Sequence, residues 1–353
     1  MRKAFKVFTI ILVVIVIVVG TLFAYVSVAL PDVGDAPELT IEPTAERIER
    51  GRYLANAVNV CMDCHSTRDW TKFSGPVLPG TMGKGGERFD QTMGFPGVYY
   101  SRNITPAGIG RYTDGELFRV ITSGVTKEGR AMFPVMPYGY YGKMDVEDIY
   151  SVIAYLRTLE PIENEEPESA SDFPMNFIIN TIPSPGTPVK KPLLSDTVAY
   201  GAYVANASGC MECHSPVDKG QIIQDKAFEG GREFAMPGGG VIRSANISMD
   251  PETGIGKWTK SAFIQRFKAY TDSSYVAPTV AQGEFNTIMP WTMYGNMTEG
   301  GSGSDLRLPQ DNASTQQCCG EVHTSIVRAV RPDVDIGALA SKTISLNLFQ
   351  RQI

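Results

Sequence analysis

The chain has 353 residues, a length typical of two domains, and its 43% hydrophobic and 20% charged residues are typical of a globular protein. The formal net charge of −6 excludes a basic nucleic-acid-binding surface and suits docking onto a basic protein partner. Of three histidines, only His323 lies outside two short cysteine motifs, which excludes a separate site built on several histidines.

An uncharged apolar segment, residues 7–30, follows Arg2, Lys3 and Lys6. About 20 helical residues cross the hydrocarbon layer of a membrane, so residues 1–30 are predicted to form a single-pass anchor. The basic residues favour a cytoplasmic N-terminus and export of the remaining chain. A cleaved signal peptide is the alternative, because Ser27-Val28-Ala29 resembles a cleavage site, although the apolar run is longer than signal peptides usually have.

Two C-x-x-C-H motifs are present, Cys61-Met-Asp-Cys64-His65 and Cys210-Met-Glu-Cys213-His214. This pentapeptide is the attachment signature of c-type haem, in which both thiols bond to the porphyrin and the imidazole binds the iron. The pair predicts two covalently bound haem c groups, with His65 and His214 as iron ligands. A zinc site or two disulfides are the alternatives, but paired zinc motifs usually lie about 15–20 residues apart and need no histidine after each pair.

A helix is predicted to lead into each motif, and matching positions of the two helices hold Gly51 and Gly201. Alanine would favour a helix there by about 1 kcal/mol, so close approach of another helix would explain both glycines. A further helix is predicted over residues 145–159, with an apolar stripe from Val146 to Leu156 and Pro161 as its stop.

Similar segments follow both motifs in the same order, which predicts a duplicated domain. Asn103-Ile-Thr matches Asn246-Ile-Ser, and Met136-Pro-Tyr matches Met289-Pro-Trp. The predicted haem domains are residues 44–160 and 197–298. Between them, residues 161–196 contain many prolines and an acidic run, and are predicted to be an extended linker. Its apolar part, residues 173–182, is expected to pack against the folded chain, for example between the domains. The predicted fold class is all-α: two tandem haem domains after a transmembrane helix.

A haem held by one histidine needs a second ligand or an open site, and the chain has no spare histidine. A methionine thioether raises the reduction potential, which suits an electron carrier. Met136 and Met289 are the predicted ligands, because each precedes proline and an aromatic residue at matching positions. Met144 and Met297 form a second matching pair, and core packing is a further interpretation of all four.

These segments resemble the repeats of bacterial membrane-anchored multihaem cytochromes c, especially the cytochrome c subunits of membrane-bound alcohol and gluconate dehydrogenases. The resemblance rests on C-M-D-C-H-S, N-I-T-P with G-I-G, M-P-Y and E-D-I-Y-S-V-I-A-Y-L-R, and covers residues 44–160 and 197–298. It implies cytochrome c folds, with His65 and Met136 on one iron and His214 and Met289 on the other. The chain has two motifs where those subunits have three, so a free-standing dihaem carrier stays open.

The predicted protein is therefore a dihaem c-type cytochrome, anchored in the bacterial inner membrane with its haem domains in the periplasm. It would relay single electrons between a membrane dehydrogenase or quinol-oxidising complex and a terminal acceptor such as an oxidase, without being an enzyme by itself. A dihaem peroxidase is the alternative. That reaction needs an iron with an open or displaceable ligand, and the methionine candidates in both domains argue against it.

After Met297 the repeat predicts another closing helix, but residues 299–353 have no helical period. Codons permitted for residues 300–313, read one base later, can encode E-D-L-G-A-I-Y-A-Y-L-K-T-M, which is similar to the closing helix of the first domain. Residues 299–353 are therefore predicted to be out-of-frame translation, in which Cys318 and Cys319 are accidental. A divergent tail with a vicinal disulfide is the alternative.

Overall fold

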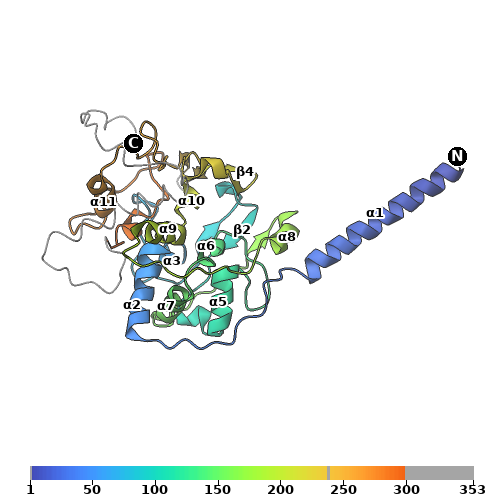
Figure 1. The fold of residues 1–353 in the computed structure, drawn as a ribbon, viewed down its shortest axis with the longest axis horizontal. Helices are drawn as coiled ribbons and strands as arrows, with labels where there is room; N and C mark the ends of the chain where they lie inside the picture. The colour runs from blue at the N-terminus through green and yellow to red at the C-terminus, as the bar shows by residue number, and fades with distance from the viewer. Residues whose placement is uncertain (1, 237–238, 299–353) are drawn as a thin grey trace.

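A long helix, α1 (Arg2–Val28), projects from the rest of the chain in the computed structural model (Figure 1). The structure describes residues 2–236 and 239–298. Within these ranges, α1 is the one helix long and apolar enough to cross a membrane, and none of its residues is buried. The segment 299–353, predicted to be out of frame, lies outside the described residues.

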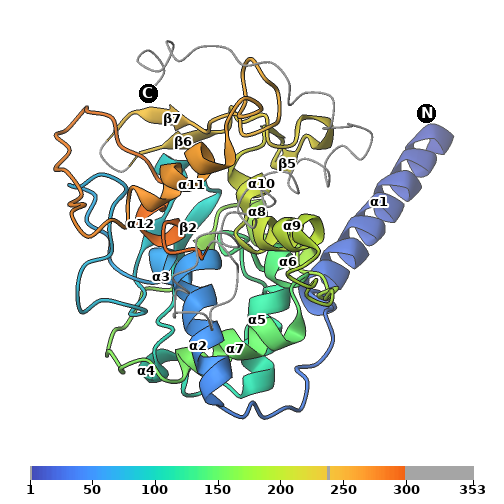
Figure 2. The same cartoon turned by 60° about the vertical axis from the view of Figure 1, so that its left-hand side comes forward.

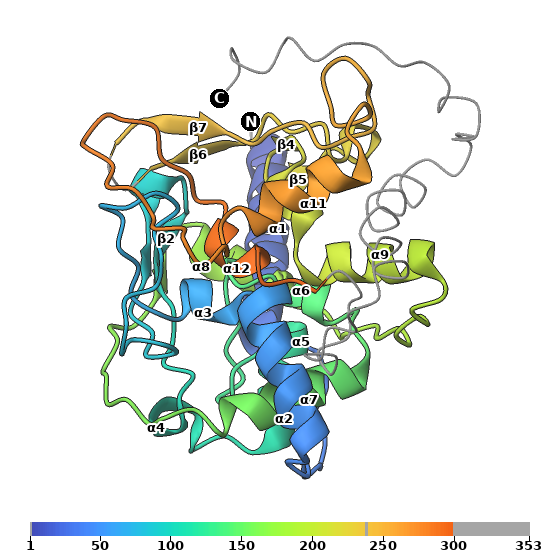
Figure 3. The ribbon, with the colours of Figure 1, turned by 90° about the vertical axis from the view of Figure 1, so that its left-hand side faces the viewer.

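We call residues 44–160 the first unit and residues 197–298 the second unit. The first unit is built around α2 (Ala45–Tyr53) and α7 (Val146–Leu156), which lie across one another (Figures 2 and 3). A π-helical turn, η1 (Leu54–Val58), extends α2 towards the first cysteine motif. At the crossing, a Cβ atom on Gly51 would lie 1.8 Å from the main-chain oxygen of Ser151. The close helix approach predicted for Gly51 is therefore confirmed. The predicted closing helix is also present, with Asp145 as its N-cap.

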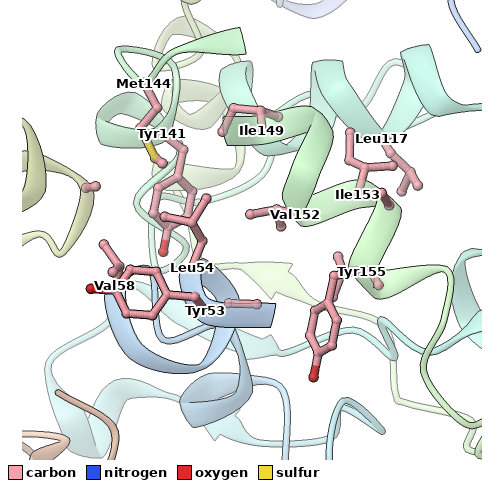
Figure 4. Packing of buried hydrophobic residues seen from close by; sticks show 14 of the residues in the cluster. Tyr53, Leu54, Val58, Leu117, Tyr141, Met144, Ile149, Val152, Ile153 and Tyr155 are labelled. Atoms are coloured by element: carbon pink, nitrogen blue, oxygen red, sulfur yellow. The ribbon is translucent and has the colours of Figure 1, made fainter. Parts of the chain in front are cut away.

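The hydrophobic core lies between these helices (Figure 4). Leu54, Met144, Ile149 and Ile153 are almost completely buried. Burying one such side chain contributes about 1.5–3 kcal/mol, so this cluster is a major stabilising element. The same cluster includes Tyr203 from α9 (Thr197–Ala207), the predicted opening helix of the second unit. The two units therefore share one core.

The other helices of the described residues are short. In the first unit they are α3 (Cys61–Cys64), η2 (Gln91–Met93), α4 (Pro106–Ile109), α5 (Asp114–Ser123) and α6 (Tyr138–Tyr141). The segment between the units contains α8 (Met175–Ile178) and η3 (Ile179–Thr181). The second unit adds α10 (Cys210–Cys213), η4 (Gln224–Lys226), α11 (Lys260–Lys268) and α12 (Trp291–Tyr294).

The all-α prediction was wrong, because the described residues include three small antiparallel sheets. The first contains β1 (Arg88–Phe89), β2 (Gly97–Tyr100) and β3 (Ala170–Ser171), with β2 central and Arg88 opposite Tyr100. The others pair β4 (Val217–Asp218) with β5 (Gln221–Ile222), and β6 (Glu233–Ala235) with β7 (Val241–Arg243). The prediction was wrong because strands of two to four residues are too short to show a period of two, and they lie in glycine-rich segments.

The segment predicted to be a linker packs along the first unit in its first part. Asn103 Nδ2 donates to the main-chain oxygen of Ile162 at 2.7 Å, and Asn164 Nδ2 donates to that of Lys84 at 2.9 Å. Strand β3 then adds to the edge of β2, with Ser171 opposite Gly97. The apolar residues 173–182 follow, and their helices contact α1 and β3.

Candidate functional site

Each C-x-x-C-H motif forms one helical turn after a residue in the left-handed conformation. Val60 precedes the first motif with a φ of 47°, and Gly209 precedes the second with a φ of 63°. Glycine adopts this conformation freely, whereas a β-branched valine is strained in it. The main-chain N–H of each motif histidine donates to the oxygen of the first cysteine at 3.0 Å. Both cysteines and the histidine are therefore placed together by one local turn.

The imidazole ring of each motif histidine contacts a main-chain carbonyl oxygen. Nδ1 of His65 lies 2.6 Å from the main-chain oxygen of Arg102, and Nδ1 of His214 lies 2.8 Å from that of Ala245. Because a carbonyl oxygen only accepts, each Nδ1–H must donate, which leaves the Nε2 lone pair for a metal. Burial lowers the pKa of both histidines and so favours the neutral, ligating form. Both imidazoles fit the role of a haem-iron ligand.

The backbone around the two histidines is held by matching contacts. The main-chain oxygen of His65 accepts from Gly85 at 2.9 Å, and that of His214 accepts from Gly230 at 2.8 Å. Both glycines have positive φ. A Cβ atom on Gly85 would lie 2.5 Å from the main-chain nitrogen of Asn103, next to the residue whose oxygen binds His65. A Cβ atom on Gly230 would lie 2.5 Å from the main-chain carbon of Ala245, whose oxygen binds His214. The geometry thus requires glycine at this place in both units.

The four motif cysteines form no disulfide in the structure. Burial raises the pKa of Cys61, Cys64 and Cys210 to about 12, and that of Cys213 to about 11. The thiols are therefore protonated at neutral pH. The charge of Asp63, in the first motif, adds a minor part to the raised pKa of Cys213 in the second.

The methionine candidates of the first unit occupy different environments. Met144 is 1% exposed, and its sulfur accepts a hydrogen bond from Asn59 Nδ2 at 3.1 Å. Met136 is only partly buried and packs at the edge of the same core. Its main-chain oxygen accepts from Tyr138 at 2.8 Å, so the loop turns immediately after it. These contacts favour Met136 over Met144 as a residue with its sulfur free to bind iron.

Met289 is held by a comparable turn in the second unit. Its oxygen accepts from the main-chain N–H of Trp291 at 2.8 Å, and its own N–H donates to Thr287 Oγ1 at 3.1 Å. Met289 is partly buried, as Met136 is. Met297, the alternative, is also partly buried and packs against the shared core.

Two tyrosines tie the methionine segments to the cysteine motifs. Tyr141 donates to the main-chain oxygen of Asn59 at 3.0 Å, and Tyr294 donates to that of Ser208 at 2.7 Å. Each acceptor lies two residues before the first motif cysteine. Burial raises the pKa of both tyrosines well above 10, which keeps them protonated donors. No role was predicted for these tyrosines from the sequence, although each is followed by glycine and lies five residues after Met136 or Met289.

The second motif is contacted by the first unit. Tyr140, which follows Met136 by four residues, donates to Glu212 Oε2 at 3.1 Å. Asn206, on α9, donates to the main-chain oxygen of Tyr140 at 3.0 Å. Glu212 also forms an ion pair with Arg232. The motif glutamate is therefore fixed from both units.

The first motif contacts the second unit through a loop. Asp63 pairs with Arg68 at 2.8 Å, and the same guanidinium donates to the main-chain oxygen of Ser74 at 2.7 Å. Burial raises the pKa of Asp63 to about 6, and the charge of Arg68 opposes that rise. Ser74 in turn donates to the main-chain oxygen of Met289 at 2.6 Å. A chain of contacts thus joins one motif to the methionine segment of the other unit.

No protein-family model matches the chain. The chain is 28% identical to the cytochrome c subunit of the quinone alcohol dehydrogenase of Gluconacetobacter polyoxogenes, over 73% of this chain and 54% of the relative. It is 27% identical to the cytochrome c subunit of the gluconate 2-dehydrogenase of Pantoea cypripedii, over 65% of this chain and 52% of the relative. It is also 28% identical to a dihaem cytochrome c-type protein of Cereibacter sphaeroides, over 47% of this chain and 56% of the relative.

The resemblance predicted from the motifs is thereby confirmed: cytochrome c subunits of alcohol and gluconate dehydrogenases are relatives of this chain. The chain spans about half the length of these relatives.

Proposed function

We propose that the protein is a c-type cytochrome with two covalently bound haems that relays single electrons. Cys61 and Cys64 would hold one haem through thioether bonds, and Cys210 and Cys213 the other. The observation that carries the proposal is the matched histidine geometry, in which both Nδ1 atoms donate to a main-chain carbonyl and both Nε2 atoms stay free for iron.

The residues of each unit have separate roles in this proposal. His65 and Met136 would hold one haem iron, and His214 and Met289 the other. Haem bound in this way undergoes one-electron oxidation and reduction, and methionine as the second ligand raises its potential. Tyr141 and Tyr294 each join a methionine segment to a cysteine motif, since each donates to the backbone two residues before the first motif cysteine.

Contacts from Asp63 through Arg68 and Ser74 to Met289, and from Tyr140 to Glu212, connect the residues that would hold the two haems, which supports electron exchange between the two proposed sites. A dehydrogenase is the proposed electron donor, as the names of the relatives suggest, with a quinol-oxidising complex as the alternative donor and an oxidase as the proposed acceptor. The catalytic step would belong to the partner. With α1 in the bacterial inner membrane, Arg2, Lys3 and Lys6 favour placement of the haem sites in the periplasm.

The intact mass of the protein purified from a host that attaches haem c tests the cofactor. Two covalent haems are expected in the wild type, and one in each double variant, Cys61→Ala/Cys64→Ala and Cys210→Ala/Cys213→Ala. Pigment that acidified acetone extracts from the wild type would contradict the covalent attachment.

The visible spectrum tests the ligands and the function. Two low-spin haems, with a methionine-to-iron charge-transfer band at the red end of the spectrum, are expected for an electron carrier. A high-spin haem in the resting protein would instead favour the peroxidase alternative.

A further inference from the structure

An apolar part of the chain lies beside the proposed membrane anchor. Residues 173–189 contain no Asp, Glu, Lys or Arg. Their helix α8 lies on the side of the body from which α1 leaves (Figure 1). The ring of Phe177 packs on the ring of Phe23 in α1, with centroids 4.7 Å apart. Asn180 Nδ2 donates to the main-chain oxygen of Val26 at 3.3 Å, so the segment is held against the last turns of α1.

The positions of these contacts along α1 indicate their depth. Counted from Val7, the first uncharged residue, about 20 helical residues at 1.5 Å each cover about 30 Å of hydrocarbon and end near Val26. Phe23 then lies about one turn inside the outer edge of that layer. Phe177 contacts Phe23 at this depth. Asn180 lies at the edge, where it pairs with one of the last carbonyls of α1, which have no partner within the helix.

Apolar side chains of the same segment face outwards. Phe173 is 81% exposed and Ile178 is 44% exposed. The ring of Phe173 lies 6.2 Å from that of Phe177, so the exposed surface is continuous with the contact on α1. Contiguous exposed apolar surface marks an interaction site, and here it adjoins a helix that is itself suited to lipid.

We propose that residues 173–182 form a second membrane contact, which lies in the interfacial region of the outer leaflet and presents Phe173, Phe177 and Ile178 to the acyl chains. This inference rests on the proposed anchoring of α1. The segment follows β3, which is paired to β2 of the first unit. A membrane contact there would hold the first haem site at a set distance and orientation from the membrane, where a single flexible tether would not.

Photolabelling of the full-length protein in phospholipid nanodiscs tests the contact. The bilayer would contain a phospholipid with a diazirine group near the glycerol end of one acyl chain, and labelled peptides would be mapped by mass spectrometry. We expect label in α1 and in residues 173–182. Phe285, an apolar residue of the second unit that is 57% exposed, provides the matched control and should stay unlabelled.

Two variants separate lipid contact from simple exposure. Phe173→Asp should lower labelling of residues 173–182 several-fold and leave the labelling of α1 unchanged. Phe285→Asp should change neither, and both side chains are exposed enough for the fold to tolerate the change. Label in α1 without label in residues 173–182 of the wild type would overturn this inference alone. Absence of label from α1 as well would overturn the anchoring and the inference with it.

Discussion

The hydroxyl of Ser74 donates a 2.6 Å hydrogen bond to the main-chain oxygen of Met289, 215 residues further along the chain. Ser74 is buried, and its φ of 64° is left-handed. Its N–H donates to Asn286 Oδ1 at 2.9 Å, and its hydroxyl accepts from the N–H of Trp291 at 3.2 Å. A loop of the first unit therefore positions the segment that carries the proposed iron ligand of the second.

Ser74→Ala should weaken the binding of Met289 to iron. The substitution removes one of the two donors to the oxygen of Met289 and leaves only the N–H of Trp291, and the loss of such a hydrogen bond costs about 0.5–1.5 kcal/mol. The methionine-to-iron charge-transfer band should lose up to about half its intensity, because the contact serves one of the two proposed methionine ligands. The number of bound haems should stay the same. Ser184→Ala, at an exposed serine, is the control, and an unchanged band in Ser74→Ala would show that this contact does not position Met289.

Met136→Ala should change the visible spectrum, whereas Met144→Ala should change the stability of the protein. Replacing Met136 should remove one iron ligand, reduce the charge-transfer band and lower one reduction potential. Replacing Met144 should keep the band but destabilise the protein by about 2–5 kcal/mol, because its side chain is 1% exposed. Spectra and denaturant unfolding distinguish the two effects. The reverse pattern would identify Met144 as the ligand.

Gly51→Ala should destabilise the first unit. A methyl group there would lie 1.8 Å from the oxygen of Ser151, so α2 and α7 would have to separate. We expect a loss of about 1–3 kcal/mol, as in other overpacked cores, against a helix-propensity gain of about 1 kcal/mol. Gly139→Ala, where a Cβ meets no atom within 4 Å, is the control for unfolding measurements. Equal stability of the two variants would contradict the close crossing.

Asp148→Asn should destabilise the protein by about 3–5 kcal/mol, because it breaks a buried ion pair. The Asp148 side chain is 1% exposed and pairs with Arg50 at 2.7 Å and with Lys191 at 2.9 Å. It also accepts from Tyr203 of the second unit at 2.8 Å. Glu147→Gln, in a neighbouring but exposed pair with Arg47, should cost less than about 1 kcal/mol. Similar unfolding free energies for both variants would contradict the role of burial.

The lowered pKa of Asp148 makes the free energy of unfolding depend on pH. Burial disfavours its charged form, but the hydrogen bonds and charges of Arg50 and Lys191 outweigh burial and lower its pKa below the usual 3.8. A carboxyl group with a lowered pKa in the folded state stabilises it fully above the unfolded pKa, and this contribution is lost as pH falls through the folded pKa. As pH falls through the acid range, the free energy of unfolding should therefore decrease less in Asp148→Asn than in the wild type. An identical acid limb in wild type and variant would contradict the assignment.

Helix α7 and its close crossing with α2 could be predicted from the sequence, whereas the small sheets and the contacts between the two units could not. The stripe from Val146 to Leu156 and the glycine at position 51 carried enough local information to predict α7 and a close helix partner. Strands such as Arg88–Phe89 are too short to produce a pattern. Tyr141 and Tyr294 occur in matching segments, but nothing local shows that their hydroxyls reach the backbone before the cysteines.

The amino-acid sequence by itself was enough to predict two C-x-x-C-H haem-attachment motifs and a helix long and apolar enough to cross a membrane. Each depends on residues within one continuous segment: thiols and imidazole on one turn, or an apolar run matched to the thickness of a bilayer. Only the tertiary structure decided that Met144 is a core residue, that Ser74 contacts Met289, and that Phe177 lies against Phe23. Those relationships join segments far apart in the chain, and the packing of the whole core sets the distance between them.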